Sequence, residues 1–244
     1  MKLMKMMVPV LMSTILAAPL LLSATANAAV RPALTRIVAL ESDKETPVKL
    51  LNDDKAHDYL VQSWIEDLQG SDKNIPIVLT PPLFKISAGR EGKLRMVILP
   101  GKIPQDRESV YWLWIQEIPP VSKAAGNQLQ LAIRTRLKIF VRPSTLKGQP
   151  ADTIGKLTWQ VSHEGGKSWL IANNPTPYYA SFSELTLTAG GKKMAVEGKT
   201  TMAAAKGETR YALPSGVSGN GTLNYSVIND FGGETPVQHQ TMTF

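Results

Sequence analysis

The clearest pattern in the chain is QLQLAIRTRLKIFVR, residues 128–142, in which apolar side chains alternate with polar or cationic ones. The apolar positions are Leu129, Leu131, Ile133, Leu137, Ile139 and Val141. A period of two is typical of a β-strand with one buried face. Fifteen residues at about 3.4 Å each would span roughly 50 Å, well beyond the usual strand of about five or six residues. A strand this long serves more than one small sheet or runs along a surface with another purpose.

Similar alternation, interrupted by glycine and proline, recurs along the chain and favours an all-β protein. Gly165-Gly166 and Gly190-Gly191 are typical of hairpin turns. The spacing within Tyr59–Ile65 fits a helix as well as a strand, so periodicity leaves that segment open. The other expected strands are 93–99, 109–118, 156–161, 178–188, 222–228 and 237–244.

A stretch rich in proline, serine, threonine and glycine, residues 143–155, has the composition of a linker. We therefore predict two β-sandwich domains, residues 29–143 and 144–244. Each is of a size that suits an immunoglobulin-like sandwich.

The N-terminus has the order of a secretory signal peptide. Lys2 and Lys5 precede an apolar run over 6–22, and the small residues Ala26-Asn27-Ala28 follow. A transmembrane anchor is disfavoured, because two prolines, a serine and a threonine interrupt a run that is already short for a bilayer. The sequence predicts a signal peptide over residues 1–28, cleaved after Ala28, and export from the cytoplasm.

The composition disfavours several classes of function. The 244 residues include no cysteine, which excludes disulfides, thiol catalysis and cysteine metal sites. The net charge of +7 is moderate, and no lysine–arginine run is dense enough to predict nucleic-acid binding.

Motifs for catalysis are missing from the sequence. The three histidines, His57, His163 and His239, have no second ligand at metal spacing, and the segment 165–168 lacks the upstream glycine of a phosphate loop. The sequence contains no G-x-S-x-G elbow. We predict no enzymatic activity, no metal, no cofactor and no small-molecule substrate. Trp112 and Trp114 share a strand face and could form a sugar-binding platform.

The long strand also suits a role in binding another chain. An exposed strand edge can pair with a partner, and side chains such as Leu129, Leu131 and Ile133, two residues apart, then fill pockets in it. Taken by themselves, these residues fit an ordinary core better than a binding role. The cations that follow them favour binding, because they suit an acidic group such as a chain terminus.

Several segments together resemble the periplasmic chaperones of the chaperone–usher pathway, the PapD-like family. Residues 134–143, RTRLKIFVRP, are similar to the family's G1 strand. The similar segments elsewhere are 103–109 followed by 117–120, and also 59–64, 81–84, 174–179 and 228–232. The resemblance covers nearly the whole chain after the signal peptide, and it implies that 59–65 is a strand.

The resemblance implies two immunoglobulin-like sandwiches set at an angle, with a cleft between them. It implies a chaperone that binds and caps pilus subunits by lending them its G1 strand, then delivers them to an outer-membrane usher. By position, Leu129, Leu131 and Ile133 would be donated, and Arg36 and Lys138 would hold the subunit's C-terminal carboxylate. Glu108, Arg142 and Asp230 match an ion network between the domains.

Two further expectations concern assembly. The short connection 121–127 between the expected strands resembles the family branch that assembles thick, rod-like pili. An apolar donor strand without a subunit could also pair with a second copy of the chain, giving a self-capping dimer.

The main alternative is a structural fimbrial subunit or secreted adhesin. A pilin would be a single sandwich with an N-terminal donor extension, usually with a disulfide, whereas this chain has the pattern of two sandwiches and no cysteine. A periplasmic enzyme or sugar-binding module would need clustered carboxylates or an aromatic platform. The resemblance favours core positions for Trp112 and Trp114, because they lie within the segment that is similar to the family's signature.

Overall fold

The computed structural model describes residues 28–121, 131–198 and 200–244, and nearly all of its regular structure is β-strand. Residues 1–27 of the predicted signal segment, the donor residue Leu129 and most of the connection 121–127 lie outside the described residues. Within the described residues no helix is long and apolar enough to cross a membrane.

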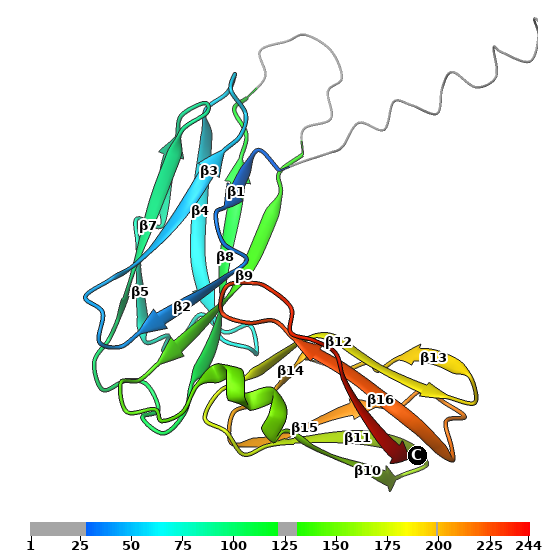
Figure 1. Ribbon diagram of the computed structural model, residues 1–244. Helices are drawn as coiled ribbons and strands as arrows, with labels where there is room; N and C mark the ends of the chain where they lie inside the picture. The colour runs from blue at the N-terminus through cyan, green and yellow to red at the C-terminus, as the bar shows by residue number, and fades with distance from the viewer. Residues whose placement is uncertain (1–27, 122–130, 199) are drawn as a thin grey trace, which may run out of the picture.

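The first sandwich packs two sheets against each other, as Figure 1 shows in blue to green. One sheet has the order β1-β3-β7-β5, formed by Val30–Pro32, Thr46–Asn52, Glu91–Ile98 and Ile77–Thr80. The other has the order β2-β9-β8-β4-β6, formed by Arg36–Leu40, Arg134–Arg142, Ser109–Ile118, Tyr59–Glu66 and Leu83–Ile86. Only β2 and β9 pair in parallel among the described strands of these sheets.

The second sandwich follows the same plan. One sheet has the order β10-β11-β15, formed by Thr158–Glu164, Lys167–Asn174 and Gly207–Ala212. The other has the order β13-β12-β16-β17, formed by Lys192–Ala195, Ala180–Ala189, Asn220–Val227 and Gln238–Thr243, and β14 (Met202–Ala203) also pairs with β12. A 3-10 helix, η2 (Pro150–Lys156), lies in the expected linker. The prediction of an all-β protein with two immunoglobulin-like sandwiches is confirmed.

The alternating patterns explain the two cores. In β8, Leu113 and Ile115 face inward and are buried with Leu137 and Ile139 of β9, as a period of two requires. The second core is built around the aromatic side chains of Trp159, Phe182, Tyr211 and Tyr225, with Leu223 beside them. Each sandwich therefore buries a hydrophobic core of its own, which a chain without cysteine needs for stability.

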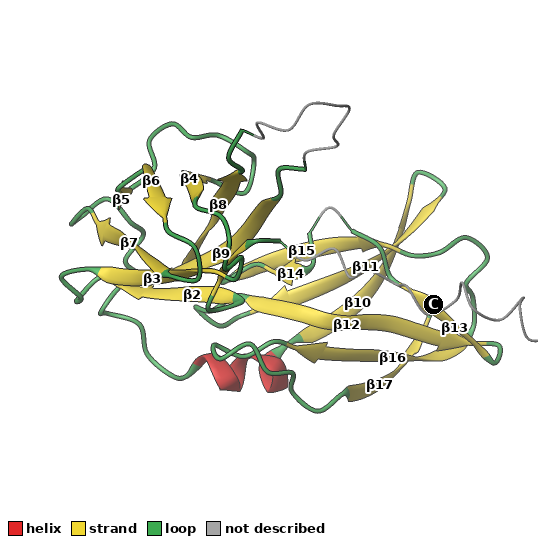
Figure 2. Cartoon of the chain, turned by 90° about the horizontal axis from the view of Figure 1, so that it is seen from above, coloured by secondary structure: helices red, strands yellow, loops and turns green. Residues whose placement is uncertain are grey.

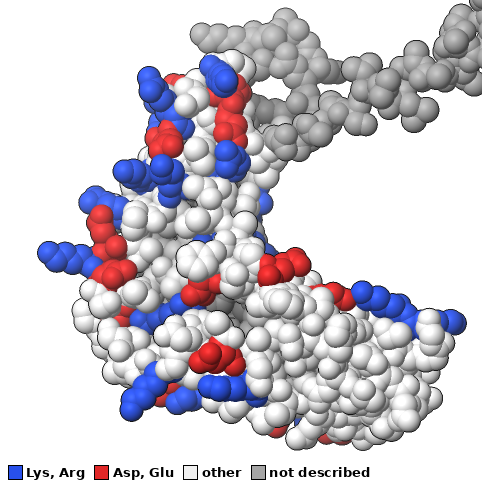
Figure 3. Space-filling view, viewed as in Figure 1, with Lys and Arg blue, Asp and Glu red and all other residues white. Residues whose placement is uncertain are grey.

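The sandwiches meet at one end and diverge, so the molecule is bent and hollowed on one side (Figures 1–3). Val110 and Phe140 of the first sandwich form a small buried cluster with Met202 of the second. This apolar contact fixes the junction beside the polar groups described below.

The strand predictions were largely correct, and the exceptions have clear causes. The segment over 59–65 is strand β4, and the glycine pair 165–166 forms the predicted turn between β10 and β11, with both residues at positive φ. The strand predicted over 128–142 is shorter in the structure, because β9 begins at Arg134 and residues 131–133 are irregular. Its partner β8 ends at Ile118, and the next two residues are prolines, which lack the N–H needed to extend the pairing.

Candidate subunit-binding site

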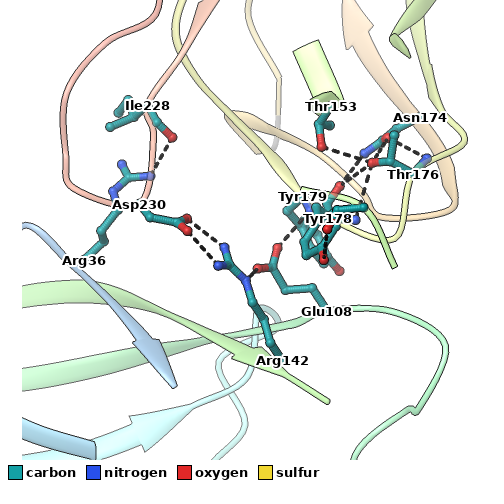
Figure 4. A network of polar contacts seen from close by, with 11 residues as sticks. Arg36, Glu108, Arg142, Thr153, Asn174, Thr176, Tyr178, Tyr179, Ile228 and Asp230 are labelled. Atoms are coloured by element: carbon teal, nitrogen blue, oxygen red, sulfur yellow. Dashed lines mark hydrogen bonds and ion pairs between the residues drawn. The ribbon is translucent and has the colours of Figure 1, made fainter. Parts of the chain in front are cut away.

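Arg142, the last residue of β9, connects the two sandwiches through two carboxylates (Figure 4). Its Nε donates to Oε1 of Glu108 at 2.7 Å, in the same sandwich. Its Nη1 and Nη2 donate to the two oxygens of Asp230 at 2.6 and 2.7 Å, in the loop that follows β16 of the other sandwich. This bidentate geometry is the strongest form of arginine–carboxylate pairing. The structure thus brings together the three residues of the expected network.

The environment of this network makes its charges depend on one another. Glu108 is almost fully buried, and this burial raises its pKa, although Arg142 and the backbone N–H of Tyr179, which donates to Oε2 at 2.8 Å, counteract the effect. Burial also opposes the charge of Arg142, but the hydrogen bonds to Asp230 and the charge of Glu108 outweigh it and raise the pKa of Arg142. Removing one of the three side chains would therefore leave a buried charge of the network without an opposite charge beside it.

Arg36 and Lys138 lie side by side on one face of the first sandwich. Arg36 begins β2 and pairs in register with Lys138 of β9, and register partners on neighbouring strands point to the same side of a sheet. Phe140 and Arg142 follow Lys138 on this face, which turns toward the second sandwich at the junction. The two expected carboxylate-binding cations are therefore neighbours in space, although they are 102 positions apart in the sequence.

Arg36 is mostly enclosed, with 8% of the residue exposed. Its Nη1 donates to the backbone oxygen of Ile228 at 3.0 Å, and its Nε is buried without a hydrogen-bond partner among the described residues (Figure 4). Burial lowers the pKa of Arg36, while Asp230 and Glu108 act in the opposite direction. An incompletely paired, buried guanidinium is costly, and an incoming carboxylate would lower that cost.

Lys138 is held across the junction by the second sandwich. Its Nζ donates to Oγ of Ser181 at 2.7 Å and lies 3.5 Å from Oγ1 of Thr201. Burial, followed by the nearby charges of Arg36 and Arg136, lowers the pKa of Lys138 to about 8. No carboxylate of the described residues forms an ion pair with Lys138.

A cavity of about 470 Å³ lies between the two sandwiches, beside Arg36. Arg36, Phe140 and Arg142 line it from one side, and Ser181, Ile228 and Asp230 line it from the other. The cavity is large enough for the end of a peptide chain. Two carboxylates, Glu108 and Asp230, also line it and pair with Arg142, so Arg36 is the lining cation whose charge is left without an ion pair among the described residues.

The low pKa of Lys138 leads to a test by pH. The ordinary pKa of lysine is 10.5, so between about pH 8 and 10 the unfolded chain holds a proton that the folded chain has lost. Stability is therefore expected to rise with pH across this window. Lys138→Met should remove the rise and increase the free energy of unfolding at pH 7, because it removes a charge whose burial is unfavourable. Urea denaturation at pH 7 and pH 9.5 measures both effects, and an equal rise in the variant would contradict the assignment.

The edge of β9 is open before Lys138. On the side away from β8, strand β2 covers β9 only from Lys138 onward, so residues 134–137 have no neighbouring strand there among the described residues. Just upstream, Leu131 is 62% exposed and Ile133 is half-buried. The ladder to β8 ends with the N–H of Glu117 donating to the oxygen of Ile133. An exposed apolar segment thus leads into a strand with a free edge, and the edge ends at Arg36 and Lys138.

Sequence reasoning missed several parts of this site. The backbone oxygen of Ile228 and the hydroxyl of Ser181 reach the cations from the second sandwich, and no sequence pattern marks them.

The preference for core positions at Trp112 and Trp114 was wrong, since both are half-buried on the outer face of β8. No cluster of possible metal ligands occurs in the described residues.

Comparison with protein families gives two matches. The model described as "Pili and flagellar-assembly chaperone, PapD N-terminal domain" matches residues 29–147. The model described as "Pili assembly chaperone PapD, C-terminal domain" matches residues 152–239. The gap between the matches falls in the expected linker.

Individual proteins agree with the family models. The chain is 38% identical to the chaperone protein LpfB of Salmonella typhimurium, over 81% of this chain and 82% of that protein. It is 34% identical to the chaperone protein FimC of Escherichia coli, over 89% and 86%. Among solved structures, the YadV chaperone matches with a TM-score of 0.74 and 33% identity, over 88% of this chain and 100% of that one. The complex of the SafA pilin with the SafB chaperone from Salmonella enterica matches with a TM-score of 0.74 and 28% identity, over 90% and 99%.

Proposed function

The chain belongs to the PapD-like family of pilus-assembly chaperones, and on this premise we propose that it binds and caps pilus subunits by donor-strand complementation. We further propose that it acts in the periplasm, reaches it by means of the signal peptide 1–28, and passes its subunits to an outer-membrane usher. The observation that carries the proposal is the free edge of β9, which ends at two neighbouring cations, Arg36 and Lys138.

The direction of the added strand follows from this arrangement. β9 runs toward Lys138, so a partner strand whose C-terminal carboxylate lies at Arg36 and Lys138 runs parallel to β9. It pairs with the free edge before Lys138 and meets β2 end to end, because β2 covers β9 from Lys138 onward. The carboxylate accepts charge-assisted hydrogen bonds from both cations, which fixes the register of the strand.

The apolar residues upstream supply the second part of the interaction. A pilus subunit that lacks its last strand exposes a hydrophobic groove, and Leu129, Leu131 and Ile133 would fill it from β9. Burying one such side chain contributes about 1.5–3 kcal/mol. Because Leu131 is 62% exposed in the free chain, most of this gain is still available when a subunit binds.

The donor-strand role is tested by Leu131→Asp. We expect subunit capture to weaken by more than about tenfold, since a carboxylate replaces an apolar contact of about 1.5–3 kcal/mol. Leu83→Asp is the matched control, because Leu83 is also exposed, at 55%, but lies on β6 away from the free edge. Co-purification of a coexpressed pilin from the periplasm measures capture, and equal pilin yield with both variants would argue against donation by this segment.

The same free edge gives the chaperone a way to protect itself before it meets a subunit. We propose that two copies can pair through residues 131–137 and bury Leu131, which would leave neither edge open to aggregation. A subunit would then compete with the second copy for one surface.

A further inference from the structure

A buried carboxylate of the first sandwich lies where the donor segment leaves the sheet. Glu117 is near the end of β8, on the inward face that also carries Leu113 and Ile115, and only 4% of it is exposed. Among the described residues, no cation forms an ion pair with Glu117. A buried charge without a cation is unfavourable unless it gains hydrogen bonds, so the groups that bind this carboxylate indicate its role.

Glu117 binds two backbone N–H groups from distant parts of the chain. Its Oε2 accepts from the N–H of Val30 at 2.8 Å, and its Oε1 accepts from the N–H of Ile133 at 3.4 Å. Val30 begins β1 and is almost fully buried in the other sheet, where it pairs with Asn52 of β3. The carboxylate therefore connects a fixed strand of one sheet to the end of the donor segment beside the other sheet.

The contact with Ile133 takes the place of a bond in the ladder between β8 and β9. A hydrogen-bonded pair in an antiparallel ladder exchanges two backbone bonds. Here the N–H of Glu117 donates to the oxygen of Ile133 at 3.1 Å, as the ladder requires, but the N–H of Ile133 donates to the side chain of Glu117. One residue thus holds both backbone groups of Ile133, at the point where the regular pairing ends.

We propose that Glu117 is a positioning residue for strand donation, whose carboxylate fixes the point and the direction in which residues 131–133 leave the sheet. This inference rests on the proposed function, because it concerns how the donor side chains are presented to a subunit. Glu117 acts through Ile133 and not by contact with the subunit. Its role is separate from that of the cations Arg36 and Lys138.

The position of Leu131 shows why this contact matters. Leu131 lies two residues before Ile133, about 7 Å along an extended chain, and on the same face. It is 62% exposed, so packing holds it less firmly than the buried residues of β9. Fixing one residue of the backbone in advance removes an entropy cost that corresponds to about a tenfold change in affinity. A fixed Ile133 therefore makes productive encounters with a subunit more frequent.

The test is Glu117→Gln, which keeps the size of the side chain but replaces one of its two acceptors with a donor. Hydrogen exchange at the Ile133 amide measures the contact itself and should become about tenfold faster. The probe for capture is a pilin that is coexpressed with the unmodified protein, separated from it in urea and diluted into each variant. Capture should become about tenfold slower. Dissociation, measured by displacement with excess unmodified protein, should not change, because the subunit then holds the donor segment.

A second variant and a matched control accompany this measurement. Glu117→Asp keeps the charge but shortens the side chain, so it cannot reach both N–H groups and should also slow capture. Asp67→Asn is the control, because Asp67 likewise accepts from two backbone N–H groups, those of Gln69 and Ser71, at 2.9 and 2.8 Å. Asp67 follows the last residue of β4, whereas Glu117 pairs with Val61 near the beginning of that strand. The control should capture pilin at the unmodified rate.

The outcomes separate this inference from the proposed function. An unmodified capture rate for Glu117→Gln would overturn the inference, even if exchange at Ile133 were faster. Unchanged exchange at Ile133, slowing that Asp67→Asn reproduces, or faster dissociation in place of slower capture would also overturn it alone. Failure of the unmodified protein to capture the pilin would count against the proposed function.

Discussion

Replacing Arg36 and Lys138 together with alanine is expected to abolish the capture of pilus subunits while both sandwiches remain folded. Each cation would give the subunit's C-terminal carboxylate a charge-assisted hydrogen bond, worth about 1.5–3 kcal/mol. Losing one of them should therefore weaken capture by about 10- to 150-fold, and losing both should bring it below detection. The effect is large because the carboxylate also fixes the register in which the rest of the strand pairs.

The measurement is the yield of a pilin that co-purifies from the periplasm with each variant, together with the variant's own thermal unfolding. Lys93→Ala is the control, since Lys93 is an exposed cation of β7 in the other sheet of the same sandwich. Lys138 is held at a pKa of about 8, mainly by burial, so its removal should not unfold the protein. Pilin at the unmodified yield with the double variant would refute the carboxylate-anchoring role.

The second large effect is expected for Arg142→Ala. This change leaves the buried carboxylate of Glu108 without its cation and removes both contacts to Asp230 across the junction. Breaking a buried ion pair from one side costs about 3–5 kcal/mol. We expect lower stability in urea and a looser angle between the sandwiches, which small-angle scattering would detect as a larger radius of gyration.

Arg107→Ala is the matched control for this prediction. Arg107 also pairs with an aspartate, Asp106, at 2.9 Å, but both side chains are exposed, and exposed pairs contribute little to stability. Arg142→Ala and Arg107→Ala should therefore differ clearly in their urea midpoints. Similar midpoints would mean that the network does not stabilise the junction.

Much of the site could be predicted because local pattern and family resemblance agree on it. The alternation over 128–142 predicted one buried face that includes Leu137 and Ile139, and both are buried. The same alternation placed Lys138 on the face opposite Ile133, and the burial of the intervening residues fits that arrangement. The resemblance predicted that Glu108, Arg142 and Asp230 form a network, and their distances agree with it.

Other features depend on contacts that no local pattern contains. Trp64 and Trp114 come from strands that are far apart in sequence, and their stacking requires the register of β4 against β8. Alternation shows that Trp112 and Trp114 share a face, but it cannot show that the face remains open to solvent. No sequence pattern shows that Arg134 and Arg136 stack on those tryptophans.

The sequence by itself determined the all-β class, the two sandwiches and the strand that carries the cations, because alternation and turn residues act over short distances. Tertiary structure alone decided where β9 begins and how Arg36 is enclosed. Residues 131–133 continue the alternating pattern, yet the last backbone hydrogen bond of the ladder runs from the N–H of Glu117 to the oxygen of Ile133. The register then brings Pro119, which has no N–H, opposite Leu131, so the pairing cannot continue. Arg36 meets the backbone oxygen of Ile228 from the other sandwich, and only packing of the two sandwiches brings these groups together.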